Sequence, residues 1–154
     1  DYYRRIEAIQ FTMAHDDGKK VDDINNAEVI LLGVSRTSKT PTSIYLANRG
    51  YKTVNVPLVL DQKIPKGLEE NKKSCIIGLI ADPERLADIR RNRVAIMKDH
   101  NLKEYTDLKY IKVEVENSKK LFKKNNWPII DVTRRSVEET AASILKIIEI
   151  KKNR

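Results

Sequence analysis

The sequence predicts an α/β protein in which a mostly parallel sheet is flanked by helices. Two stretches, residues 29–32 and 75–81, are continuously apolar, which is typical of strands buried on both faces of a parallel sheet. Helical patterns separate the apolar stretches along the chain, as expected for repeated βαβ units. The first stretch also runs into a glycine and a polar loop, residues 33–40, from which a helix starts.

The size and composition of the chain are those of one globular domain. With 154 residues, of which 34% are charged and 40% hydrophobic, we expect residues 1–154 to form a single domain. No apolar stretch approaches the ~20 residues that span a bilayer, so no membrane partner is expected. The single cysteine, Cys75, excludes a disulfide framework and favours a cytoplasmic location. The chain starts in helical phase without Met, so we interpret it as the C-terminal part of a longer protein, with residues 151–154 disordered.

The net charge of +8 allows several classes of partner. Nucleic acid is disfavoured, because the basic residues are spread over helix faces and no aromatic-rich strand pair of the RNA-binding type is present. Acidic small molecules or an acidic protein surface suit this charge equally well. A homo-oligomer stays open at this point.

The polar loop resembles a phosphate-binding loop. It fits the pattern G-x-x-x-x-G-K-[ST] at three of its four fixed positions, and Ser38 stands where the second glycine is usual. A strand that ends in such a loop directs backbone N–H groups inward, and the following helix adds the positive end of its dipole. The sequence therefore predicts a P-loop NTPase-like fold with phosphate bound by Gly33, Val34, Ser35, Arg36, Thr37, Ser38, Lys39 and Thr40.

Two residues of this loop have specific expected roles. Lys39 would reach the terminal phosphates, and the hydroxyl of Thr40 would hold Mg²⁺. Pro41 then falls in the first helical turn, where its missing N–H is tolerated. The alternative is a Ser/Thr-rich loop between strand and helix with an incidental lysine.

A helix precedes the loop. Tyr2, Ile6, Ile9 and Met13 recur at helical spacing and predict its apolar face. The helix ends at the sequence His15-Asp16-Asp17-Gly18, where negative charge opposes the helix dipole.

The carboxylates after this helix have two interpretations. His15, Asp16 and Asp17 are candidate catalytic residues, of which Asp16 or Asp17 could act as a general base or bind a metal ion near the phosphate loop. The alternative is a solvated turn.

The middle of the chain continues the pattern of strands and helices. We expect a helix over residues 41–49, a strand over 53–56 and a long loop over 57–71 that could act as a lid or contact a partner. The strand at 75–81 delivers Asp82 at its C-terminal end. This placement suits a Mg²⁺-binding carboxylate, but Asp82 before Pro83 is also a good helix N-cap, and the two roles could coexist.

The last third supplies helices and one short strand. Arg85 could clamp a phosphate, whereas Arg90, Arg91 and Arg93 are interpreted as solvated. Residues 98–106 are expected to form a loop with a surface histidine, His100. A helix from residue 108 to about 125, a strand at 127–131 and a helix opened by the Ser136–Glu139 capping box complete the expected fold.

Taken together, these motifs resemble a known family. The relevant segments are Arg5–Ile9 with His15–Gly18, Gly33–Pro41, Gly50–Lys52 with Asn55–Leu58, Ile77–Leu79 with Asp82–Leu86, and Asp131–Thr133 with Ser136–Ala141. In this order they resemble the bacterial pyruvate, phosphate dikinase regulatory proteins and the related phosphoenolpyruvate synthetase regulatory proteins, whose members are longer than this chain. In that family the loop carries a serine at the position of Ser38.

The resemblance implies a bifunctional enzyme. Such an enzyme phosphorylates a threonine of pyruvate, phosphate dikinase or phosphoenolpyruvate synthetase with ADP, and it removes that phosphate with inorganic phosphate to release pyrophosphate. On this hypothesis Lys39 and Mg²⁺ neutralise charge, Asp16 or Asp17 takes the threonine proton, and Arg36 and Arg85 steady the transferred group. Two alternatives are a non-catalytic domain that senses nucleotide or phosphate, and a P-loop kinase of small molecules that uses ATP.

Overall fold

The fold was determined from a computed structural model, which describes residues 2–15, 24–97 and 103–152. Four strands and six α-helices are assigned in these ranges, together with one short 3₁₀ helix, η2 (Ile24–Asn26). The strands are β1 (Val29–Gly33), β2 (Thr53–Pro57), β3 (Cys75–Ile80) and β4 (Ile129–Asp131). The α-helices are α1 (Tyr2–Ala14), α2 (Lys39–Asn48), α3 (Pro83–Met97), α4 (Lys103–Thr106), α5 (Leu108–Lys124) and α6 (Val137–Lys152).

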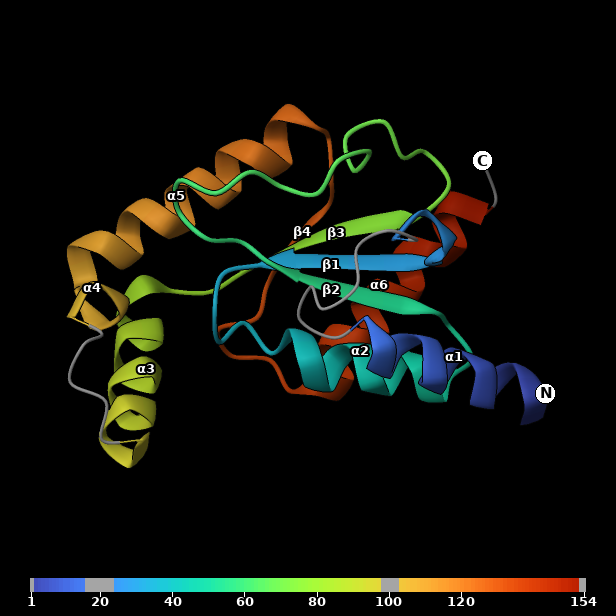
Figure 1. Ribbon diagram of the computed structural model, residues 1–154, viewed down its shortest axis with the longest axis horizontal. Coiled ribbons are helices and arrows are strands. Elements are labelled where there is room, and N and C mark those ends of the chain that lie inside the picture. Colours follow the sequence, from blue (N-terminus) through green and yellow to red (C-terminus); the bar gives the residue numbers. More distant parts are fainter. Residues whose placement is uncertain (1, 16–23, 98–102, 153–154) are drawn as a thin grey trace.

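The four strands form one all-parallel sheet in the order β2-β1-β3-β4. Strand β1 is central, with Leu31 opposite Asn55 of β2 and Ile77 of β3. Helices cover the sheet, so the predicted α/β fold with a parallel sheet is confirmed (Figure 1). Because all strands are parallel, the segments that follow them meet at one edge of the sheet, where open α/β sheets bind ligands.

Both faces of the sheet are buried, which explains why β1 and β3 are apolar at successive positions. Val29 and Leu31 pack on one face in a core shared with α2, α3, α5 and α6. Ile30 and Leu32 pack on the other face in a core that includes Phe122 of α5. Side chains alternate between the faces of a strand, so each face receives every second residue of β1.

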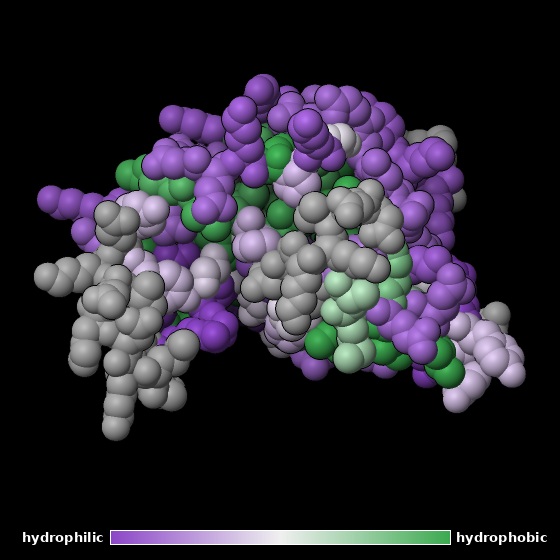
Figure 2. All heavy atoms as spheres, in the orientation of Figure 1, coloured by the Kyte–Doolittle hydropathy of each residue, from purple (hydrophilic) through white to green (hydrophobic). Residues whose placement is uncertain are grey.

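One end of the sheet carries a helical projection. Helices α3 and α4 lie beyond the C-terminal ends of the strands, and α5 runs from α4 back over the sheet to contact β3. We call α3, α4 and α5 together the helical arm (Figure 1). Most side chains on the face seen in Figure 2 are hydrophilic, with apolar side chains visible only in smaller areas. None of the described helices is long and apolar enough to span a membrane.

The predicted apolar face of α1 is only partly buried: Ile6 and Ile9 are half-buried, but the two ends of this face are exposed. Tyr2 and Met13 are 66% and 64% exposed, whereas Ala8 and Thr12 are buried against the rest of the domain. Small side chains allow α1 to approach α2 and β2 closely, and the Thr12 hydroxyl accepts a hydrogen bond from the backbone N–H of Thr53 at 3.1 Å. The buried face of α1 thus includes a polar contact to the start of β2, which apolar periodicity alone does not predict.

Three further expectations can be compared with the structure. Lys103–Thr106 form helix α4, although we expected residues 98–106 to be a loop. Lys151 and Lys152 belong to α6 rather than to a disordered tail, and the Lys151 ammonium donates a hydrogen bond to the backbone carbonyl of Ser74. The capping box is confirmed, since the Ser136 hydroxyl accepts from the Glu139 N–H at 3.1 Å and the Glu139 carboxylate accepts from the Ser136 N–H at 3.3 Å.

The buried thiol of Cys75 is free, as expected. Its burial raises the pKa of the thiol, so Cys75 stays protonated around neutral pH. His100 lies outside the described residues.

Candidate functional site

The candidate site is the loop between β1 and α2, which begins at Gly33. A Cβ atom at Gly33 would lie 2.6 Å from the hydroxyl of Thr37 and 3.0 Å from the carbonyl oxygen of Leu79. The loop therefore turns so tightly at this position that only glycine fits. The Gly33 carbonyl accepts a hydrogen bond from the Leu58 N–H at 2.9 Å, which ties the start of the loop to the end of β2.

Two non-glycine residues of the loop adopt the left-handed conformation. Arg36 has φ 72°, and Ser38 has φ 61° with ψ 32°. Left-handed residues alternating with right-handed ones turn successive N–H groups toward a common centre, which forms a concave anion-binding site. The conformation of Ser38 also explains why the pattern usually has glycine here, because glycine adopts it without a steric penalty.

The strain at Ser38 gives a stability prediction. A left-handed non-glycine residue costs roughly 1–2 kcal/mol, and part of the gain from glycine is offset by its greater freedom in the unfolded chain. Ser38→Gly should therefore raise the free energy of unfolding by up to about 1 kcal/mol, measured by urea denaturation. Ser38→Ala is the matched control and should give no gain. A glycine variant no more stable than the alanine variant would contradict the strained conformation.

The loop is held internally by its own side chains. The Val34 carbonyl accepts hydrogen bonds from the Lys39 ammonium at 3.0 Å and from the Thr37 hydroxyl at 2.9 Å. Lys39 is only 6% exposed and Thr37 is fully buried. The lysine is thus folded over the loop, with its positive charge close to the loop backbone.

A pocket of about 280 Å³ opens over this loop. Its wall combines loop residues, the first turn of α2 and two apolar residues from other elements: Ser35, Arg36, Ser38, Lys39, Thr40, Pro41, Pro57 and Ile89. The first turn of α2 lies at this pocket, so the positive end of the helix dipole is close to it. Backbone donors, a lysine and a helix N-terminus together make the pocket suitable for phosphate groups.

The helix after the loop begins earlier than expected. Lys39 and Thr40 already belong to α2, although we expected it to start at Pro41. Pro41 is in the first turn, as predicted. The backbones of Lys39 and Thr40 are therefore held in the helical conformation beside the pocket.

A second pocket lies along the same edge of the sheet. It is lined by Asp82, Asp131, Thr133, Arg134, Arg135 and Glu139. The Asp82 carboxylate caps α3 by accepting from the Arg85 N–H at 3.2 Å, so the predicted cap is confirmed. The Asp131 carboxylate accepts from the hydroxyl of Thr133, and that hydroxyl accepts from the Asp82 N–H at 2.8 Å.

The donors predicted for Mg²⁺ are a hydroxyl and a carboxylate, which are suitable oxygen ligands. Thr40 lies in the phosphate-loop pocket and Asp82 follows the adjacent strand, β3. The cap on α3 uses Oδ2 of Asp82, so capping and metal binding by this carboxylate are compatible. Among the described residues, no group of three or more His, Cys, Asp or Glu could hold a metal ion by itself. Mg²⁺ here would depend on phosphate oxygens of a ligand, as is usual for this ion.

The other described residues predicted to be catalytic do not all line the pocket of the phosphate loop. Arg36 lines the pocket of the loop. Arg85 is exposed on the first turn of α3 and is not among the described residues that line this pocket. His15 is 2% exposed and stacks on Phe11, with ring centroids 4.0 Å apart, and its Nδ1 lies 2.7 Å from the Phe11 carbonyl. Its catalytic role stays a prediction, as do those of Asp16 and Asp17, which lie outside the described residues.

Arg90 was misinterpreted as solvated. Its side chain is fully buried and pairs with Glu114 of α5, with Nη1 2.7 Å from Oε1, whereas Arg91 and Arg93 are exposed as expected. The sequence carried a signal for this burial. Arg90 lies four residues after Leu86 and three after Ala87, on the buried face of α3.

The fold and the site together define a class of protein: an α/β domain with a P-loop-like strand, loop and helix at the C-terminal edge of a parallel sheet. The comparison with protein families is more specific. Residues 1–145 match the model of the kinase/pyrophosphorylase family, and the chain belongs to this family.

Similar curated proteins are known from several bacteria. The chain is 62% identical over 154 residues to a protein of Pelagibacter ubique, covering 99% of the chain and 56% of that protein. It is 56% identical over 148 residues to a protein of Bartonella bacilliformis, covering 96% of the chain and 53% of that protein. Both relatives are provisionally named pyruvate, phosphate dikinase regulatory protein, which confirms the resemblance found in the sequence. The chain spans about half the length of these relatives.

Proposed function

We propose that this chain carries the phosphate-binding centre of a bifunctional regulatory enzyme. In one direction the enzyme transfers the β-phosphoryl group of ADP to a threonine of pyruvate, phosphate dikinase or phosphoenolpyruvate synthetase. In the other it transfers that group from phosphothreonine to inorganic phosphate. Family membership supports the two reactions, and the names of the relatives support the dikinase as the target. The single cysteine favours the cytoplasm as the location.

The observation that carries the proposal is the Gly33–Thr40 loop with Lys39 folded over it. Its pocket of about 280 Å³ lies just below the range of about 300–1,000 Å³ typical of ligand sites, and Arg36 and Lys39 are among the residues that line it. The loop would therefore hold the phosphates that take part in both reactions: the β-phosphate of ADP or the pair of phosphates that become pyrophosphate.

The two reactions need the same groups. In the kinase direction the threonine oxygen attacks the β-phosphorus, the bond to the bridging oxygen breaks, AMP leaves, and a carboxylate, Asp16 or Asp17, takes the hydroxyl proton. In the reverse direction an oxygen of inorganic phosphate attacks the phosphothreonine phosphorus, pyrophosphate forms and the threonine oxygen regains a proton. Lys39, the α2 N-terminus and Arg36 would stabilise the charge on the transferred group in both cases. Thr40 and Asp82 would hold Mg²⁺, which when bound neutralises phosphate charge.

The proposal is tested by phosphate transfer from ADP labelled at its β-phosphate to purified dikinase and to purified synthetase. The assay uses this chain and, in parallel, the complete Pelagibacter ubique relative. Label on a target threonine with ADP, and its release as pyrophosphate on addition of inorganic phosphate, is the expected result. Nucleotide binding without transfer by either protein would favour a sensing domain. Transfer from ATP to a small acceptor without a protein target would favour a small-molecule kinase.

A further inference from the structure

The buried pair Arg90–Glu114 connects the helical arm to the phosphate loop. Arg90 comes from α3 and Glu114 from α5, and their side chains are 0% and 8% exposed. Nη1 of Arg90 donates to Glu114 at 2.7 Å and to the Tyr105 carbonyl at 3.1 Å, and Nη2 donates to the Ser35 carbonyl at 3.1 Å. A single guanidinium thus joins three elements of the arm to the third residue of the loop.

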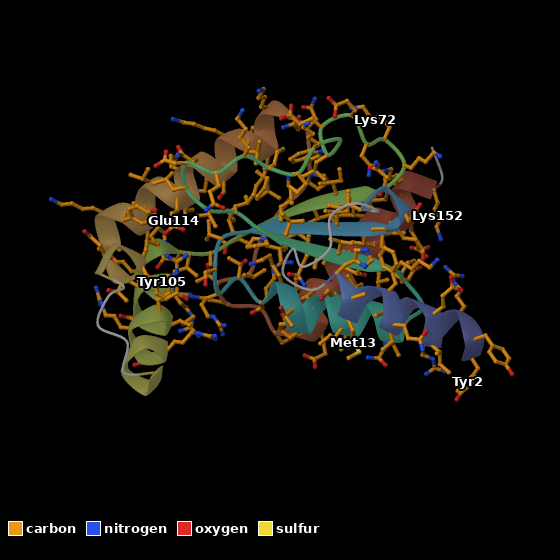
Figure 3. The ribbon with its side chains drawn as sticks, in the orientation of Figure 1. Tyr2, Met13, Lys72, Tyr105, Glu114 and Lys152 are labelled. Atoms are coloured by element: carbon orange, nitrogen blue, oxygen red, sulfur yellow. The ribbon has the colours of Figure 1, made fainter. Side chains whose placement is uncertain are left out.

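Tyr105 of α4 adds a second connection between the arm and the loop. Its hydroxyl lies 2.8 Å from the hydroxyl of Ser35. Its ring packs against the Arg90 guanidinium, with 4.7 Å between the ring centroid and Cζ of Arg90. Tyr105 and Glu114 lie near one another where α4 and α5 meet the rest of the domain (Figure 3). Ser35 is therefore held at both its carbonyl and its hydroxyl.

The hydrogen bond to the Ser35 carbonyl also fixes the direction of the next backbone N–H group, that of Arg36. A trans peptide unit is planar, and its C=O and N–H point in opposite directions. When Arg90 holds the Ser35 carbonyl, the N–H of Arg36 must point to the opposite side of the loop, away from Arg90. Arg36 is in the left-handed conformation required for a concave arrangement of N–H groups.

The pair is poorly explained as a device for stability alone. A buried ion pair loses its hydration, and replacing it with apolar side chains of similar volume is often neutral or stabilising. In addition, Nε of Arg90 is buried without a hydrogen-bond partner in the described part of the chain. Glu114 balances the charge of Arg90, so the guanidinium acts on the loop through the Ser35 carbonyl rather than as a ligand of the phosphate.

We infer that Arg90, balanced by Glu114, is a positioning residue that orients the Ser35–Arg36 peptide so that the Arg36 N–H can bind phosphate. The inference rests on the proposed function for the identity of the ligand. It also assigns a role to the helical arm: α3, α4 and α5 hold the phosphate loop in its binding conformation.

The test separates positioning from stability with a double variant. Arg90→Met alone leaves Glu114 buried and unpaired, and we expect a marked fall in melting temperature. Arg90→Met/Glu114→Met removes both charges and should recover most of that loss. Binding of ADP and of pyrophosphate, measured by calorimetry, should nevertheless remain weaker than in the wild type by about tenfold or more in the double variant. Arg91→Met/Asp88→Met, which removes an exposed ion pair of the same helix, is the matched control and should bind as the wild type does.

A ligand-free measurement supports the binding data. Arg90→Lys keeps a positive charge but cannot hold Glu114 and the Ser35 carbonyl in the same fork. The backbone amide resonance of Arg36 should therefore shift in this variant and remain unchanged in the Arg91 control. If the folded Arg90→Lys variant and the folded double variant bind pyrophosphate as tightly as the wild type, the inference about Arg90 is overturned but the proposed function is not. A wild-type chain that binds neither ADP nor pyrophosphate would overturn the proposed function, and this role of Arg90 with it.

Discussion

Replacing Lys39 with alanine should abolish both phosphoryl-transfer reactions while leaving the chain folded. Lys39 is 6% exposed, and its ammonium lies 3.0 Å from the Val34 carbonyl. Removing one donor that stabilises developing charge typically lowers kcat by about 10²–10³-fold, and this lysine also contributes a full positive charge. Activity is measured as label transfer from ADP to a target threonine and as pyrophosphate release.

The fold of the Lys39→Ala variant should survive, because Thr37 still donates to the Val34 carbonyl at 2.9 Å. Loss of the lysine hydrogen bond should lower the free energy of unfolding by only about 1 kcal/mol. Lys39→Met is a useful second variant, since it keeps the apolar stem and removes only the charge. Lys72→Ala, at an exposed lysine, is the control. Near-normal turnover in both Lys39 variants would contradict the assignment of the loop.

Replacing Gly78 with alanine should strongly destabilise the fold. Gly78 lies in β3, and a Cβ atom at this position would come within 2.3–2.5 Å of three ring atoms of Phe122. Phe122 is fully buried in the core between α5 and the sheet, so the ring cannot move aside without displacing its neighbours. Overpacking of this kind costs about 1–3 kcal/mol or more, which corresponds to a fall in melting temperature of roughly 6–12 °C at the upper value.

A rescue variant identifies the cause of this destabilisation. Phe122→Leu removes ring atoms that the new methyl group would meet. Phe122→Leu/Gly78→Ala should therefore be clearly more stable than the sum of the two single changes predicts, a non-additivity expected of contacting residues. Thermal unfolding followed by circular dichroism gives the comparison. A Gly78→Ala protein with the same melting temperature as the wild type would show that the core has room for a methyl group at this position.

The central part of the fold could be predicted from the sequence because it is encoded locally. The apolar run of β1, the glycine that follows it and the lysine at the start of α2 are adjacent in the chain and have one favourable arrangement. The prediction even located Ser38 as the exceptional position of the loop, and the structure places this residue in the left-handed conformation. Asp82 as the cap of α3 and Ser136 as the cap of α6 were predictable for the same reason.

The features that were mispredicted depend on contacts between distant residues. Arg90 and Glu114 are 24 positions apart, and neither side chain on its own indicates that the other will be buried beside it. Both lie on buried helical faces, since Glu114 follows Ile111 by three residues, but charged residues on such faces are usually expected to be exposed. The buried face of α1 was only partly predicted, because it includes Thr12, which accepts a hydrogen bond from Thr53, a residue distant in the sequence.

The central claim is that the Gly33–Thr40 loop binds the phosphates of ADP. It is tested most directly by following the backbone amide resonances of this chain during titration with ADP and with pyrophosphate. We expect saturable shifts of the Gly33–Thr40 amides with both ligands, and loss of these shifts in Lys39→Ala. Shifts confined to the pocket lined by Asp82, Asp131 and Glu139, or no shifts at all, would contradict the claim.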